Sequence, residues 1–92
     1  MKQEVAETRA LELLAWLVGE EDLMPVFLGA TGASADDVKA RAANPDFLAS
    51  FMDFLMMDDE WIIKAAEATG QAPESIAQIR AGLPGGQLPN WT

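Results

Sequence analysis

The sequence predicts an all-α fold, a compact domain of six helices, and three observations favour this class. The chain has 92 residues, half of them hydrophobic, which suits one domain with one core. Sixteen residues are alanine, whereas valine, isoleucine and threonine together number twelve, so intrinsic propensity favours helix over strand. Apolar residues recur at helical spacing, which places one helical domain over residues 1–82 and an irregular Pro/Gly-rich C-terminal tail over residues 83–92.

The first helix is expected over residues 4–18 and ends at Gly19. Its apolar side chains share one broad arc, which contains Ala6, Ala10, Leu13, Leu14, Leu17 and Val18. The acidic run 20–22 begins a second helix. That helix carries Pro25 in its first turn, where no intrahelical N–H is needed, and it stops at Gly32.

A third helix starts at Ser34, because Asp37 stands three residues later as in a capping box, and it ends before Pro45. The fourth helix, over residues 45–57, is the most strongly apolar and is the expected hub of the core. Its apolar arc contains Phe47, Leu48, Phe51, Met52, Phe54 and Leu55.

The fifth helix is expected from about residue 60 to residue 69, where Gly70 ends it in a left-handed conformation. The sixth helix begins near Pro73, a residue suited to the first helical turn, and it stops at Gly82. The side chains expected to be buried in this last part are Ile76, Ile79 and Leu83.

A shift of 38 residues aligns the two halves of the chain, so that Thr31-Gly32 falls on Thr69-Gly70 and the first three helices map onto the last three. One interpretation is a duplication, with pseudo-repeated three-helix units at about 1–38 and 39–82 that pack face to face. The alternative is that any two amphipathic helices separated by glycine turns resemble each other. The sequence leaves both interpretations open.

The charge balance bears on the partners of the protein. Six Lys and Arg against fifteen Asp and Glu give a formal net charge of −9. Phosphate backbones and anionic lipids repel such a chain, so a nucleic-acid partner is disfavoured and no membrane partner is expected. The expected partner is another protein with a basic or apolar surface, and the expected state is a monomer or a weak homodimer.

The composition also argues against catalysis. The chain has no His, Cys or Tyr, which removes thiol nucleophiles, Ser-His pairs and the usual zinc sites. The acidic runs 20–22 and 58–60 are contiguous, unlike a calcium loop, and are expected to stabilise helix N-termini. We therefore expect no enzyme, no cofactor and no metal. A carboxylate-dependent enzyme stays as an alternative, and it would need a cleft with two convergent acids.

The fifth and sixth helices resemble a DNA-binding helix-turn-helix in their spacing. Ala66, Gly70 and Ile76 supply the small residue, the turn glycine and the buried aliphatic residue of that motif. The sixth helix, which would enter the DNA groove, offers only Gln78 and Arg80 as donors to bases and phosphates. An atypical nucleic-acid reader is therefore an alternative that the net charge disfavours.

The N-terminus indicates a cytoplasmic location. Residues 1–4 carry an acid where a signal peptide has a positive segment. The apolar stretch 10–18 is interrupted by Glu12 and is shorter than the ~20 residues that span a bilayer.

The chain resembles a family of short acidic helical proteins from alphaproteobacteria that is classed as a domain of unknown function. The resemblance lies in Ala30-Thr31-Gly32, the segment 45–55, Ala68-Thr69-Gly70 and Leu83-Pro84-Gly85-Gly86. It implies a stand-alone cytoplasmic bacterial protein, and it implies no activity, ligand or functional residue.

The leading hypothesis is a non-enzymatic interaction or regulatory module that binds another protein through an apolar surface framed by acid. Trp16, Met57 and Trp91 are the candidate contacts, because they are large apolar residues outside the clearest core arcs. Trp16 and Met57 lie on the flanks of their helices, and Trp91 lies in the tail.

Overall fold

The computed structural model describes residues 1–85, which form six helices and no strand, so the expected all-α class is confirmed. Every expected helix is present, and the observed ends differ from the expected ends by a few residues. The helices are α1 Gln3–Val18, α2 Leu23–Thr31, α3 Ala35–Arg41, α4 Pro45–Leu55, α5 Asp59–Thr69 and α6 Ser75–Ala81.

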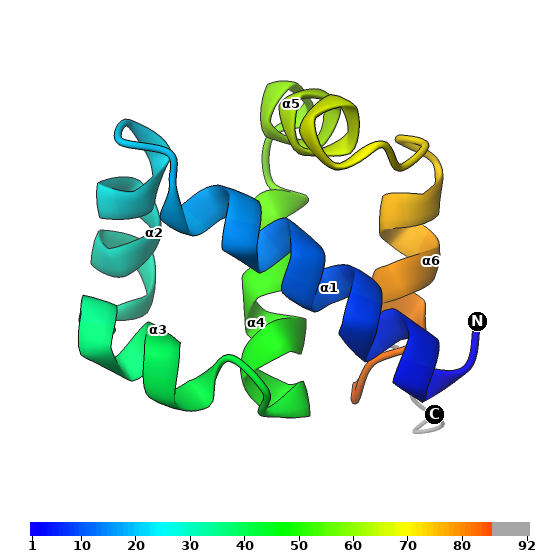
Figure 1. Ribbon diagram of the computed structural model, residues 1–92, viewed down its shortest axis with the longest axis horizontal. Coiled ribbons are helices and arrows are strands. Elements are labelled where there is room, and N and C mark those ends of the chain that lie inside the picture. The colour runs from blue at the N-terminus through cyan, green and yellow to red at the C-terminus, as the bar shows by residue number, and fades with distance from the viewer. Residues whose placement is uncertain (86–92) are drawn as a thin grey trace.

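α1 crosses the middle of the domain and packs against α2, α4, α5 and α6 (Figure 1). In this view α4 lies behind α1, with α2 and α3 at the left, α5 at the top and α6 at the right. α1 is also the longest helix, with 16 residues. It therefore provides the common surface on which the shorter helices pack.

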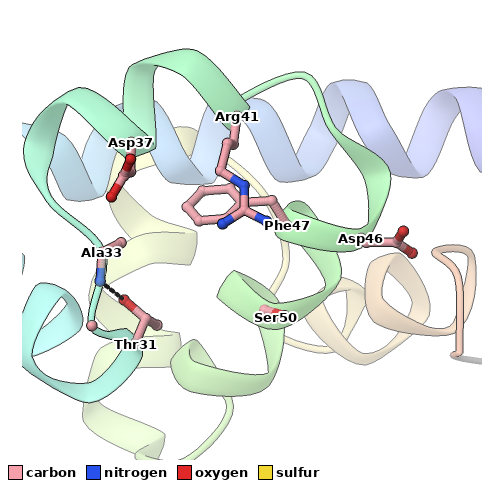
Figure 2. A pocket seen from close by; sticks show the side chains of 8 residues that line it. Thr31, Ala33, Asp37, Arg41, Asp46, Phe47 and Ser50 are labelled. Atoms are coloured by element: carbon pink, nitrogen blue, oxygen red, sulfur yellow. Dashed lines mark hydrogen bonds between the residues drawn. The ribbon is translucent and has the colours of Figure 1, made fainter.

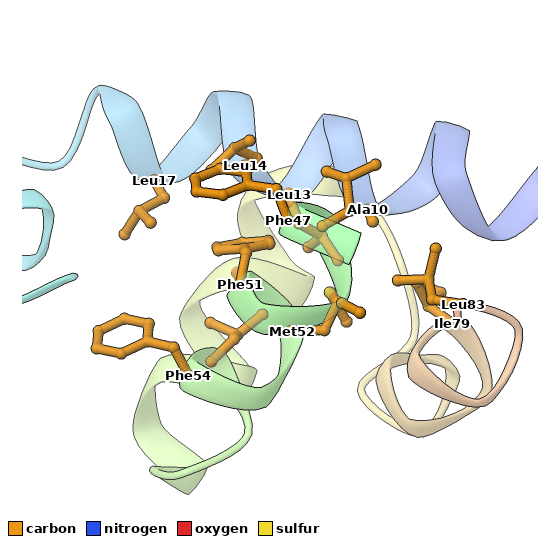
Figure 3. Packing of buried hydrophobic residues seen from close by; sticks show 14 of the residues in the cluster. Ala10, Leu13, Leu14, Leu17, Phe47, Phe51, Met52, Phe54, Ile79 and Leu83 are labelled. Carbon is orange, nitrogen blue, oxygen red and sulfur yellow. The ribbon is translucent and has the colours of Figure 1, made fainter. Parts of the chain in front are cut away.

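One cluster of buried apolar side chains fills the space between α1 and the helices around it (Figure 3). α4 contributes seven buried residues, more than any other helix, in agreement with its expected role as the hub of the core. From α1 the cluster includes Ala6, Ala10, Leu13, Leu14 and Leu17, each at most 1% exposed. Leu83 is also buried, so the packed part of the chain continues past the end of α6.

Phe27 of α2 is the centre of an aromatic cluster that joins α2 to α4. Its ring meets the rings of Phe47, Phe51 and Phe54 edge to face, at centroid distances of 6.0, 5.8 and 5.1 Å. Each such pair contributes about 0.5–1.5 kcal/mol beyond the burial of apolar area. These contacts hold α2 against α4. They thereby also restrain the C-terminal end of α1, which directly precedes α2 in the chain.

Val18 is not part of the buried arc of α1, and this expectation was wrong. Its side chain is 45% exposed, whereas Leu14, one turn earlier, is buried. The reason is tertiary: Val18 lies on the flank of α1 that faces the short helix α3, and there it lines an open groove with Val38. A helical arc specifies which residues share a side of the helix, whereas the neighbouring helix decides how far that side is covered.

The helix ends confirm the capping box, and both acidic runs lie at the start of a helix, as expected. The Ser34 hydroxyl accepts from the Asp37 N–H at 3.1 Å, and the Asp37 carboxylate accepts from the Ser34 N–H at 3.0 Å. Asp58 caps α5 by accepting from the Glu60 N–H at 2.8 Å. Asp22 makes no side-chain cap, because its own backbone is already helical (φ −83°, ψ −35°) and a capping residue needs an extended one.

Several features agree with a duplicated unit. Gly32 and Gly70 both end a helix in the left-handed conformation, with φ of 75° and 71°. The Thr31 and Thr69 hydroxyls each donate to the backbone carbonyl four residues earlier, at 2.9 and 2.7 Å. The contact of α1 with α5 is equivalent, under the same shift, to that of α4 with α2. Duplication stays a prediction, since unrelated glycine-terminated helices share such ends.

Glycine substitutions distinguish close packing from open space. A Cβ on Gly82 would lie 2.8 Å from the Ala6 Cβ and 3.2 Å from the Met1 carbonyl oxygen, whereas a Cβ on Gly29 would meet no atom of residues 1–85 within 4 Å. We expect Gly82→Ala to lower the free energy of unfolding by about 1–3 kcal/mol, because α1 must shift away from the end of α6. We expect Gly29→Ala to raise it by about 0.5–1 kcal/mol, because alanine favours the helix. Urea denaturation measures both, and a Gly82→Ala variant as stable as the parent would contradict the packing.

Candidate functional site

The structure separates the three residues expected to make contacts. Trp16 is partly buried and packs against the core, and it lines a surface pocket. Met57 lies in the turn between α4 and α5, where its side chain is 76% exposed. Trp91 lies outside the residues that the structure describes. Trp16 and Met57 are thus accessible to different degrees, and the pocket at Trp16 is the better-formed feature.

The Trp16–Trp61 pocket forms where the end of α1, the start of α2 and the outer side of α5 meet. It has a volume of about 160 Å³. Its lining residues are Trp16, Glu20, Asp22, Leu23, Val26, Trp61 and Lys64. Two indoles and two apolar side chains therefore share one hollow with two carboxylates and one ammonium group.

Trp61 is a pocket residue that the sequence analysis missed. Its indole stacks on Phe54, with ring centroids 4.7 Å apart and planes 22° apart, so one face of the indole is covered and its orientation is fixed. The 38-residue shift contained a signal, because it aligns Trp61 with Leu23 and Trp16 with Phe54. Trp16, Leu23 and Trp61 line this pocket, and Phe54 forms the stack with Trp61.

A second hollow is the α1–α3 groove, which is almost entirely apolar. It has a volume of about 260 Å³. Its lining residues are Leu11, Leu14, Ala15, Val18, Val38, Lys39 and Ala42. Leu11 and Val18 are 41% and 45% exposed, so this groove presents apolar side chains directly to solvent. The sequence analysis missed it because it assigned a single apolar arc to α1.

The third hollow, of about 360 Å³, lies between α3 and the first turns of α4 (Figure 2). Its polar groups largely serve the chain itself. The Thr31 hydroxyl donates to the Phe27 carbonyl and accepts from the Ala33 N–H, and Asp37 belongs to the capping box. The Arg41 guanidinium lies 5.5 Å from the ring centroid of Phe47, within cation–π range. Thr31 and Asp37 therefore stabilise helix ends, and Arg41 packs on an aromatic ring of the core.

Acid–base chemistry has little support in this hollow. Hydrogen bonds from the Ser34 backbone and then from its hydroxyl lower the pKa of Asp37, and the charge of Arg41 contributes less. A lowered carboxyl pKa keeps the group ionised at neutral pH, which suits a cap rather than a general acid. Within residues 1–85, no three acidic side chains are grouped closely enough to hold a metal ion.

The helix-turn-helix alternative loses its main cation in the fold. The Arg80 guanidinium pairs with both carboxylate oxygens of Asp53, at 2.6 and 3.2 Å, and donates to the Pro84 carbonyl at 3.1 Å. α6 itself has seven residues. Arg80 therefore ties α6 to α4, and contacting a phosphate would require these bonds to break.

Residues 3–86 match the family described as "Protein of unknown function (DUF3572)". The chain belongs to this family. The resemblance to a domain-of-unknown-function family is thereby confirmed, and the alphaproteobacterial lineage stays a prediction. No curated protein and no solved structure gives a significant match. Over the described part of the chain, none of the helices combines the length and the hydropathy needed to cross a membrane.

The capping box makes stability depend on pH in a defined direction. The folded pKa of Asp37 is below its ordinary value of 3.8, so its contribution is present above that value and is lost as the pH falls through the folded pKa. We expect Ser34→Ala to cost about 1 kcal/mol at pH 7. Part of this cost should disappear between about pH 4 and pH 2, because the hydroxyl no longer stabilises a charged Asp37 carboxylate there, whereas alanine keeps the larger backbone hydrogen bond at every pH.

Urea midpoints at several pH values measure this effect. Ser50→Ala is the matched control, because Ser50 is an exposed serine inside α4 rather than at a helix N-terminus. We expect the control to change stability by less than about 0.5 kcal/mol at every pH. A cost of Ser34→Ala that stays constant from pH 7 to pH 2 would contradict the assignment.

Proposed function

We propose that the protein is a non-enzymatic interaction module that binds another protein by receiving a basic side chain of that partner in the Trp16–Trp61 pocket. The observation that carries the proposal is the convergence of two indoles and the carboxylates of Glu20 and Asp22 on one hollow. Indole faces attract cations, and a desolvated cation–π contact contributes about 0.5–2 kcal/mol. Nearby carboxylates add attraction for the same charge.

The size of the pocket supports a side chain rather than a metabolite. Its volume of about 160 Å³ is below the roughly 300–1,000 Å³ of typical small-molecule sites. Tryptophan is enriched among the residues that dominate protein–protein binding, especially where neighbouring contacts exclude water. Val26 also lines the pocket and is 47% exposed, so its side chain can contact the partner and exclude water from the two indoles.

The charge of the whole chain supports a basic partner. A net charge of −9 attracts a cationic surface over a distance of about 10 Å at ordinary ionic strength. Among the described residues that line the pocket, Lys64 is the single basic one, against two acids. The absence of His and Cys from the sequence supports the non-enzymatic part of the proposal.

A titration with N-acetyl-arginine amide tests the proposal, with N-acetyl-citrulline amide as its neutral isostere. We expect the arginine compound, and not the citrulline compound, to shift the indole N–H signals of Trp16 and Trp61 in ¹H–¹⁵N spectra. The double variant Glu20→Gln, Asp22→Asn should weaken this binding about fivefold, since each carboxylate at such a solvent-accessible site contributes about 0.5 kcal/mol.

Glu21→Gln is the matched control, because Glu21 lies between the two carboxylates in the chain but does not line the pocket. It should leave the titration nearly unchanged. In affinity capture, a partner should be retained by the control and lost by the double variant. Equal shifts with the neutral isostere, or signal changes away from both indoles, would contradict the proposal.

A further inference from the structure

α1 carries apolar side chains on a second side, away from the core. Leu11, Ala15 and Val18 follow one another at spacings of four and three residues and therefore form one stripe. All three side chains are exposed. The stripe begins about 140° around the helix from Trp16, since successive residues advance by about 100°. It is therefore separate from the Trp16–Trp61 pocket.

α3 turns this stripe into a groove. Leu14 and Val38, 1% and 2% exposed, form the floor, and Ala42 lies on the opposite wall. Small side chains on both walls, Ala15 and Ala42, leave room for the backbone of a third helix to approach. Apolar helix faces of matching period pack by placing the side-chain ridges of one helix into the grooves of the other.

The length of the groove defines the segment that fits. Leu11 and Val18 are seven residues apart, which is about 10.5 Å along a helix. A partner helix with apolar residues at positions i, i+4 and i+7 spans the same distance. Binding of an amphipathic helix in an apolar groove through such anchors is a common mode of peptide recognition.

Charges around the groove specify the partner further. The hollow that adjoins it at Leu11 is lined by Glu4 and Glu7, whereas Lys39 is the charged residue that lines the groove itself. A complementary helix has basic residues at the end near Glu4 and Glu7 and an acidic residue where it passes Lys39. A second copy of this chain fits less well, because each copy carries a formal charge of −9 and the two repel.

We propose that the α1–α3 groove binds one face of an amphipathic helix of a partner protein, a helix that is basic at one end and acidic opposite Lys39. This site is independent of the Trp16–Trp61 pocket and of the function proposed for it. It adds a second interaction surface to the same central helix.

The test is fluorescence anisotropy with a labelled 15-residue helical peptide. The peptide has leucines at i, i+4 and i+7, a glutamate near its middle and two lysines at one end; a second version has the lysines at the other end. A third peptide of the same composition has its leucines scattered around the helix. We expect one of the first two peptides to bind and the scattered peptide to bind at least about tenfold more weakly.

Two variants at positions of similar exposure locate the site. Leu11→Glu places a charge in the groove, and Val5→Glu places one on the same helix at a residue 44% exposed that does not line the groove. We expect Leu11→Glu to weaken binding about tenfold and Val5→Glu to weaken it less than about twofold. Ala15→Arg provides a second groove variant, and circular dichroism verifies that each variant is folded.

Three results would overturn the proposal. One is equal binding of the scattered peptide, and another is an equal loss of affinity in the two glutamate variants. The third is a parent protein that sediments as a dimer and becomes a monomer on Leu11→Glu, because the groove would then be occupied by a second copy of this chain.

Discussion

Burial of one face of α1 determines how the other helices are placed. The face grades from small to large side chains along α1: Ala6, which lies beside Gly82 at the end of α6, and Ala10 come first, and Leu13 and Leu17 follow, all 0% exposed. Small residues let the chain at Gly82 approach within van der Waals distance, and large ones fill the wider space beside α4. Because interiors are close-packed, a change at either end moves the helices that rest on α1.

The same helix also supplies both candidate interaction surfaces. On either side of its buried face, α1 has a flank that carries apolar side chains. On each flank another helix forms the second wall of a hollow. Trp16 lines a pocket with Trp61 on one side, and the stripe that starts at Leu11 lines a groove with α3 on the other. The helices that carry the apolar walls of both hollows are held by the core, which keeps those walls in place before a partner binds. Glu20 and Asp22 lie in the turn between α1 and α2.

Most of the fold could be predicted from the sequence, because glycine, proline and capping residues mark the helix ends and apolar spacing marks the buried faces. The surfaces could not be predicted to the same degree. Val18 and Leu14 share a side of α1 in any helical projection, yet one is exposed and the other buried, since Val18 borders the open groove beside α3. The sequence also could not show that Asp22 makes no side-chain cap whereas Asp58 does, because the backbone dihedrals at a turn depend on tertiary packing. Trp61 lacked a local signal, as its orientation comes from the stack on Phe54.

Native-state hydrogen exchange is the most direct measurement of whether α1 holds the domain together. If it does, the amides of Leu13, Leu14 and Leu17 exchange only through global unfolding, with a free energy within about 1 kcal/mol of the value from urea denaturation. Amides of α3 should exchange through local opening at a lower free energy. If the α1 amides instead exchange at a clearly lower free energy than those of α4, then α1 detaches while the rest stays folded. That result would contradict this account of the fold and of both surfaces.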